Sequence, residues 1–296
     1  MVLKNFYQDA RPLSDIYKVK GKIFTANYFP MRMLICAPSG SGKSNLVANM
    51  AVDHVVWDTL TVFCENSNQH IFKVLANYLR DTYAKSGNNP DEYIHFSNTI
   101  DKTLEEFNPE LANLVIFDDM TTKSNMPLIE EYFRNGRNKN ISIINICQNY
   151  CKSNQNIRDN VNILITAKPA NTCHAAMIRA KYGNDLTRVV FDEVVQIATK
   201  STVLQDPEAF LICFENEPDL SKKFRRCLDE CGILTSDGNI NPKYKQSNIV
   251  KKKNPMIEID DEFLYNDFDS ASDNDNDSEY DDVRYVAPIK RCTRKY

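Results

Sequence analysis

The stretch MRMLICAPSGSGKSNLVANM, residues 31–50, constrains the fold more than any other part of the chain. A short apolar run from Met33 to Cys36 predicts a buried strand, and a helical pattern begins at Lys43. Between them lies a turn-forming segment with Gly40 and Gly42. A strand, a glycine-rich loop and a helix in this order direct backbone N–H groups and the positive end of the helix dipole at one point, where an anion binds. The stretch therefore predicts a phosphate-binding loop.

The residues of this loop have distinct expected roles. Glycine lets the main chain approach the phosphates closely. The Lys43 ammonium reaches the β and γ oxygens, and the Ser44 hydroxyl ligates Mg²⁺. The predicted nucleotide-binding residues are Ala37, Pro38, Ser39, Gly40, Ser41, Gly42, Lys43 and Ser44. Ala37 stands where the pattern G-x-x-x-x-G-K-[ST] has its first glycine, so a serine-rich turn before a lysine is the alternative interpretation.

A second motif lies in NLVIFDDM, residues 113–120. The apolar run from Leu114 to Phe117 predicts a central parallel strand, and it ends in Asp118 and Asp119. Ligands of open α/β sheets bind at the carboxyl ends of strands, so we expect both carboxylates beside the phosphate loop. One carboxylate holds Mg²⁺ through water, and the next accepts a proton from the water that attacks the γ-phosphate. The alternative is that the pair caps the following helix.

A third motif follows the isoleucine-rich run ISIINI, residues 141–146. This run predicts another core strand, and Gln148 comes just after it. An amide at that strand end, next to the phosphate loop, hydrogen-bonds the γ-phosphate or the attacking water. Gln148 alone is a weak signal, because a glutamine at a strand end usually faces solvent.

The rest of the chain alternates strands with helices, which indicates a mostly parallel sheet with helices on both faces. The further strands expected are Thr61–Cys64, Tyr93–Phe96, Val161–Thr166, Val203–Leu204 and Ala209–Phe214. The further helices expected are Gln69–Tyr83, Ala175–Tyr182 and Leu186–Thr199.

Composition narrows the class of protein. With 296 residues and 42% apolar content, the chain can fill a sizeable core. We see no signal peptide and no apolar stretch near the roughly 20 residues that span a bilayer. Nine cysteines without a pairing framework fit reduced thiols in a cytosol-like compartment. No cysteine or histidine set completes a zinc site, and we interpret His174 as structural.

Charge is distributed unevenly. Between Met256 and Tyr285 there are twelve acidic residues against one arginine, whereas the chain before this segment is mildly basic. We expect an N-terminal lead-in at 1–30, a P-loop ATPase domain at 31–250 and a disordered acidic tail at 251–296. The tail is interpreted as a docking or shielding segment, or as a solubilising extension. The basic clusters at 221–226 and 251–253 suit DNA phosphates, although such clusters are also solvated faces or localisation signals.

Four segments together resemble the DNA-packaging ATPases of large DNA viruses, virophages and related mobile elements. They are APSGSGKS at 37–44, VIFDD at 115–119, FRNGRNKN at 133–140 and ISIINICQNY at 141–150. The family is typified by the poxvirus packaging ATPase and belongs to the FtsK–HerA superfamily. The resemblance covers about residues 31–215, and its sharp motifs lie at 31–50 and 113–165.

The resemblance implies a RecA-like ASCE P-loop NTPase fold. The strand before Gln148 is then inserted between the phosphate-loop strand and the strand before Asp118. Position by position, Gly40, Gly42, Lys43 and Ser44 match the phosphate-binding loop. Asp118 matches the Mg²⁺-associated acid, Asp119 the catalytic acid and Gln148 the strand-end sensor.

Ring ATPases complete each site with an arginine from the neighbouring subunit, because the charge on the transferring phosphoryl group must be neutralised. Arg134 and Arg137 precede the sensor strand, and Arg158 lies ten residues after Gln148. We rank Arg137 first. Each arginine is equally compatible with a surface position or a DNA contact.

The implied function is an ATP-hydrolysing motor that translocates double-stranded DNA into a viral capsid, with ATP and Mg²⁺. The implied partners are double-stranded DNA, viral capsid proteins and further copies of the chain in a pentameric or hexameric ring, without a membrane. The implied location is the host-cell cytoplasm at the virus assembly site, and the virion. Two other classes stay open: another FtsK–HerA-type DNA pump or helicase-like ATPase, and a nucleotide-dependent switch or scaffold that does not translocate.

Overall fold

The computed structural model describes residues 29–66, 70–151, 153–169, 171–200, 210–226, 228 and 231–245. The strands are β1 Arg32–Cys36, β2 Thr59–Cys64, β3 Ile94–Ser97, β4 Asn113–Asp118, β5 Ile141–Cys147, β6 Ile163–Thr166, β7 Leu211–Phe214 and β8 Phe224–Arg225. The α-helices are α1 Lys43–Asn49, α2 His70–Lys85, α3 Met126–Asn135, α4 Gln155–Asn160, α5 Thr172–Tyr182, α6 Arg188–Ala198, α7 Leu220–Lys223 and α8 Pro242–Lys245. Shorter helical turns are η2 Met50–His54, η3 Pro90–Glu92, η4 Leu104–Glu106 and η5 Gly136–Lys139.

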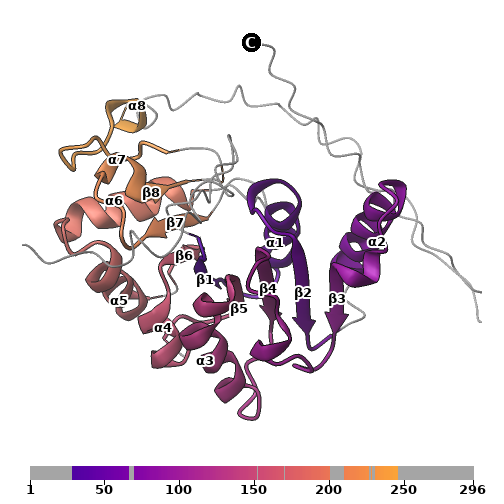
Figure 1. Ribbon diagram of the computed structural model, residues 1–296. Helices are drawn as coiled ribbons and strands as arrows, with labels where there is room; N and C mark the ends of the chain where they lie inside the picture. The colour runs from indigo at the N-terminus through magenta and orange to yellow at the C-terminus, as the bar shows by residue number, and fades with distance from the viewer. Residues whose placement is uncertain are drawn as a thin grey trace, which may run out of the picture. The chain divides into compact units, whose positions relative to one another are not determined.

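The strands form one sheet in the order β3-β2-β4-β5-β1-β6-β7-β8 (Figure 1). Neighbours from β3 to β6 run parallel, whereas β7 pairs antiparallel with both β6 and β8. The sheet is thus mostly parallel, and β5 lies between β1 and β4, as the resemblance implies. This α/β topology confirms the predicted fold class.

Burial explains why the central strands are mostly apolar. Every residue of β4 and β5 is buried, because a parallel strand in the middle of such a sheet is covered on both faces. Alternate residues of β5 point to opposite sides: Ile144 packs in the core on the side of α1 and α2, and Ile143 in the core on the side of α3 to α6. Helix α2 shows the matching pattern, since its buried residues Phe72, Leu75, Ala76 and Leu79 form one stripe.

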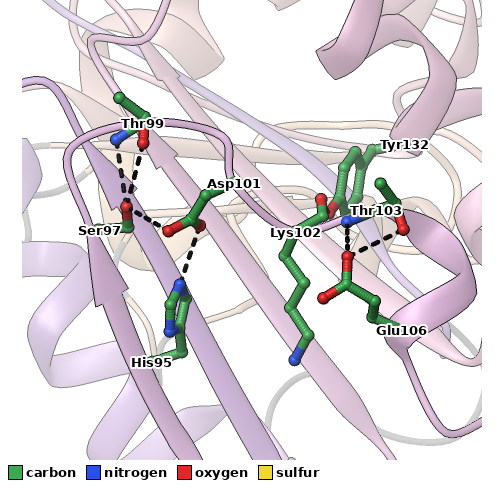
Figure 2. Close-up of polar contacts among 8 residues, drawn as sticks. All are labelled: His95, Ser97, Thr99, Asp101, Lys102, Thr103, Glu106 and Tyr132. Atoms are coloured by element: carbon green, nitrogen blue, oxygen red, sulfur yellow. Dashed lines mark hydrogen bonds and ion pairs between the residues drawn. The ribbon is translucent and has the colours of Figure 1, made fainter.

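The link from β3 to β4 contains no α-helix, only η4. Polar contacts hold its first part, as Figure 2 shows: the Asp101 carboxylate lies 3.0 Å from His95 Nε2 and accepts from Ser97 Oγ at 2.9 Å. Further along, Glu106 accepts from the Thr103 N–H at 2.7 Å, and Tyr132 of α3 donates to the Lys102 carbonyl at 2.6 Å. Side-chain hydrogen bonds therefore hold this link against the sheet, whereas a packed helix holds the crossover connections elsewhere.

Trp57, the one tryptophan of the chain, is tied to the segment that continues the phosphate-loop helix. Its Nε1 donates to the Ala51 carbonyl in η2 at 2.7 Å. Its ring stacks on Tyr83 of α2 with centroids 6.2 Å apart. The indole thus bridges η2 and α2.

Most predicted elements are found within a few residues of their expected bounds. The helices α3, α4, α7 and α8 and the strand β8 were not expected. The expected strand 203–204, the lead-in at 1–28 and the tail at 251–296 lie outside the described residues. None of the described helices combines the length and apolar character that a bilayer span requires.

The basic cluster at 221–226 is not a uniform charged surface. Lys223 is only 5% exposed, and its Nζ pairs with the Asp185 carboxylate. Lys222 pairs with Asp219 at 3.0 Å. These two pairs engage two of the cluster's four cations within the chain, which weakens its interpretation as a DNA contact. The cluster at 251–253 lies outside the described residues.

Candidate nucleotide-binding and hydrolysis site

The phosphate loop has the backbone geometry that its glycines predict. Gly40 and Gly42 adopt positive φ angles of 75° and 87°. These are left-handed conformations that residues with a Cβ rarely adopt. Gly42 is the N-cap of α1, and the Leu46 N–H donates to its carbonyl at 2.9 Å. The backbone N–H groups in the first turn of α1 therefore point toward the loop.

Ala37 continues the strand rather than the loop, which explains why a glycine is not needed there. Its N–H donates to the Cys147 carbonyl of β5 at 3.3 Å. The residue is 2% exposed, and it packs in the core on the side of α1 and α2. Its φ is not among the positive values of the described residues. The departure from the motif therefore leaves the loop geometry intact.

Lys43, the first residue of α1, reaches back over the loop. Its Nζ donates to the carbonyls of Ala37 and Pro38, both at 2.8 Å, and the side chain is 8% exposed. The ammonium is thus held above the mouth of the loop by two weak acceptors. Phosphate oxygens are stronger acceptors for a charged donor than these neutral carbonyls.

Asp118 is the last residue of β4 and is 5% exposed. Burial, followed by the neighbouring negative charge of Asp119, raises the pKa of the Asp118 carboxyl to about 6. The Cys64 thiol, 3.6 Å from Asp118 Oδ2, and the Lys43 ammonium partly oppose this increase. A buried carboxylate of raised pKa gains from a nearby cation, so Asp118 suits a metal position.

Asp119 differs from its neighbour in exposure and in backbone conformation. It is exposed, and its φ is 53°. Asp is among the few residues that tolerate the left-handed region. The turn away from the strand sends this carboxylate toward solvent, in agreement with a group that handles a water molecule.

Gln148 follows the last residue of β5 and is exposed. Cys147 is the register partner of Cys36, the residue before the phosphate loop. Ile146 is the register partner of Asp118 on the other side. The carboxyl ends of β1, β5 and β4 therefore lie side by side, and the sheet brings Lys43, the two aspartates and Gln148 to one edge.

The three candidate arginines lie elsewhere. Arg134, in the last turn of α3, and Arg137, in η5, are exposed and precede β5, so they lie at the amino end of the strands. The pKa of Arg32, the first residue of β1, is lowered by burial and then by the positive charge of Arg137, in agreement with that position. Arg158 lies in α4, and its Nη1 donates to backbone carbonyls of residues 150–153.

Cys64 is a site residue that the sequence did not reveal. It ends β2 and is the register partner of Asp118. Burial, and next the negative charge of Asp118, raises the pKa of the thiol to about 12, so the thiol stays protonated and can donate. Only the strand order, which places β2 beside β4, would have pointed to this residue.

The donor set fits Mg²⁺ bound together with a nucleotide. The described residues contain no cluster of three or more metal-binding side chains. Ser44 would supply an oxygen ligand directly and Asp118 would hold the ion through a bound water, with phosphate oxygens and further water as the other ligands, which is a usual arrangement for Mg²⁺ in nucleotide sites.

Comparison with known families shows which family the chain belongs to. Residues 22–181, more than half of the chain, match the family model described as the poxvirus A32 protein. The chain belongs to the poxvirus A32 protein family. This membership confirms the resemblance seen in the four sequence segments. No curated protein matches the chain.

Several solved structures are similar to this A32-family chain. The genome packaging NTPase B204 from Sulfolobus turreted icosahedral virus 2, in complex with AMP, is 15% identical, covers 66% of this chain and 96% of its own, and has a TM-score of 0.42. The DNA-packaging ATPase B204 from Sulfolobus turreted icosahedral virus is 13% identical, with 67% and 97% covered and a TM-score of 0.42. The cytoplasmic domain of EssC is 14% identical, with 54% and 35% covered and a TM-score of 0.38. Identities and TM-scores this low carry no inference about activity.

Proposed function

We propose that this A32-family chain is an ATP-hydrolysing motor that translocates double-stranded DNA into a viral capsid. The observation that carries the proposal is the position of β5 between β1 and β4, which gathers Lys43, Asp118, Asp119 and Gln148 at one edge of the sheet. A protein that only binds a nucleotide needs the loop and a metal-associated acid. The second carboxylate and the strand-end amide are groups that hydrolysis requires.

The phosphate loop and its helix hold the triphosphate. Backbone N–H groups at the start of α1 and the Lys43 ammonium bind phosphate oxygens, since Lys43 exchanges two neutral carbonyl acceptors for charged ones. The Ser44 hydroxyl and the Asp118 carboxylate hold Mg²⁺. When bound, Mg²⁺ supplies positive charge against the phosphate oxygens.

Asp119 and Gln148 act on the attacking water. The exposed Asp119 carboxylate accepts a proton from the water, and the Gln148 amide orients that water or hydrogen-bonds the γ-phosphate. Gln148 therefore distinguishes the states before and after loss of the γ-phosphate. Because parallel strands end at a common edge, neither group requires a rearrangement of the sheet.

The negative charge on the transferring phosphoryl group is neutralised in part by an arginine from the neighbouring subunit of a homo-oligomeric ring. Arg134 and Arg137 are exposed at the amino end of the strands, opposite the phosphate loop, so they act on a neighbouring copy and not on their own nucleotide. A ring around double-stranded DNA, docked on capsid proteins, places the motor in the host-cell cytoplasm at the site of virus assembly and in the virion.

ATP hydrolysis with and without double-stranded DNA tests the proposal. We expect DNA-stimulated turnover by the unaltered chain and loss of turnover in Lys43→Ala and Asp119→Asn, with nucleotide still bound by Asp119→Asn. Nucleotide binding without any hydrolysis would instead support a switch or scaffold. DNA-stimulated hydrolysis that never depends on empty capsids would favour another type of DNA pump.

A further inference from the structure

Three backbone carbonyls in the loop after β5 converge on one guanidinium. Arg158 Nη1 donates to the carbonyls of Tyr150 and Cys151, both at 3.3 Å, and to the carbonyl of Ser153. Carbonyl oxygens that point at one spot repel one another unless a donor lies between them. A planar, permanently charged guanidinium meets this demand.

Arg158 is itself held in place. Its guanidinium lies 5.7 Å from the centroid of the Tyr150 ring, and Tyr150 is 3% exposed. Lys181 of α5 donates to the Arg158 carbonyl. At the start of α4, the Glu130 carboxylate of α3 accepts from Asn154 at 2.6 Å and from Asn156 at 2.9 Å. The arginine therefore joins the loop to a helix that is anchored on both sides.

Gln148 lies between two fixed points of the backbone. On one side, the Cys147 carbonyl accepts from the Ala37 N–H. On the other, the Asn149 carbonyl accepts from the Ser153 N–H at 3.1 Å, and the Asn149 side chain accepts from the Cys151 N–H at 3.0 Å. The second fixed point belongs to the same loop whose carbonyls Arg158 holds.

We propose that Arg158 is a positioning residue for Gln148 and acts within its own subunit. The inference rests on the proposed function, because it concerns the sensor of the same site. It also removes Arg158 from the candidates for the arginine supplied by a neighbouring subunit: its Nη1 is engaged with the loop, whereas Arg134 and Arg137 are exposed.

Steady-state kinetics give the first test. In Arg158→Met we expect kcat to fall at least about tenfold, while KM for ATP changes less than about twofold, because misplacement of a sensor affects the reacting geometry and not the phosphate loop. Arg158→Lys retains a charged donor and should recover most of kcat. Arg188→Met is the matched control, since Arg188 is 73% exposed on α6 and should leave kcat unchanged.

A double-mutant cycle links the effect to the sensor. Once Gln148→Ala has removed the amide, Arg158→Met should cause little further loss of kcat. Purely additive losses would mean that Arg158 acts on something other than Gln148, and would overturn the inference.

Mixed rings decide between the two arginine roles. Subunits with Arg158→Met are combined with subunits that carry Lys43→Ala. If Arg158 acted on the neighbouring subunit, a Lys43→Ala subunit would still supply its intact Arg158 to the intact phosphate loop of an adjacent Arg158→Met subunit. Activity would then rise in the mixture. Positioning within the subunit predicts no recovery, because each subunit then carries a defective site of its own. Arg137→Met subunits mixed with Lys43→Ala subunits are the positive control, because Arg137 is proposed to act on a neighbouring copy and activity should recover.

Folding is checked separately, by thermal unfolding and ADP affinity. If Arg158→Met does not fold, Arg158→Gln, which keeps an amide donor, replaces it in each measurement. Recovery in mixed rings, or an unchanged kcat, would overturn the inference alone. Absence of hydrolysis by the unaltered chain would overturn the proposed function and this inference with it.

Discussion

Cys64 and Asp118 are register partners on neighbouring parallel strands, and the Cys64 thiol lies 3.6 Å from Asp118 Oδ2. Both side chains are almost completely buried, at 4% and 5% exposed. The thiol proton is shared between this carboxylate oxygen and the Asn66 carbonyl, which lies 3.2 Å from the sulfur. We expect the other carboxylate oxygen to accept from a metal-bound water. The pair links a strand without any recognised motif to the chemistry of the site.

Replacement of Cys64 should weaken the metal site. In Cys64→Val the Asp118 carboxylate loses a donor while the core volume is nearly kept. We therefore expect the Mg²⁺ concentration for half-maximal nucleotide binding to rise about tenfold, the lower end of the range for groups that orient a metal ligand. A fluorescent ATP analogue titrated with Mg²⁺ measures this. Cys213→Val, a buried thiol on β7, is the control and should not change the midpoint.

Burial of Asp118 should cost stability in the absence of nucleotide. Because the folded-state pKa is raised to about 6, the unfolded chain loses the proton first, and stability falls as the pH rises from the ordinary aspartate value to about 6. We expect Asp118→Asn to raise the free energy of unfolding at pH 8 by up to about 3 kcal/mol. The gain should be much smaller at pH 4. Urea unfolding at both pH values measures it, with Asp81→Asn, at an exposed position of α2, as control. An equal gain at both pH values would contradict the charge-based cause.

Exchange of glycine and alanine should weaken nucleotide binding at Gly40 but not at Ala37. Ala37→Gly should keep nucleotide affinity within about twofold and cost about 0.5–1 kcal/mol of stability, because the strand position needs no positive φ. Gly40→Ala should cost about 1–2 kcal/mol and weaken binding, since a Cβ is strained at φ 75° even though no atom lies within 4 Å of it. Isothermal titration with an ATP analogue and urea unfolding check both. Weakened binding in Ala37→Gly alone would contradict the assigned geometry.

Gly183 should tolerate no side chain, for a steric reason. A Cβ at this position would lie 2.5 Å from Phe191 Cδ2. Gly183→Ala is therefore expected to destabilise the fold by about 1–3 kcal/mol. In a double-mutant cycle, Phe191→Leu should make Gly183→Ala less costly. Additive losses would show that the clash is relieved by other movements.

The sequence predicts the central strands and their polar ends well, because a buried parallel strand leaves a mostly apolar run that is followed directly by a charged or amide side chain. It does not by itself place β5 between β1 and β4. That order came from the family resemblance, and the strand pairing confirms it.

Other features depend on contacts between distant parts of the chain and leave no local signal. The link between β3 and β4 is held by Asp101, Glu106 and Tyr132, each bonded to a partner that periodicity does not identify. Cys64 matters only because β2 adjoins β4. The roles of Arg134 and Arg137 depend on a neighbouring subunit, so they stay predictions.

The bond from Trp57 to Ala51 gives the protein an intrinsic optical reporter. Since the chain has a single tryptophan, excitation near 295 nm selects one indole, and that indole is attached to the segment that continues the phosphate-loop helix. Stopped-flow emission from the unlabelled protein should therefore follow nucleotide arrival in real time.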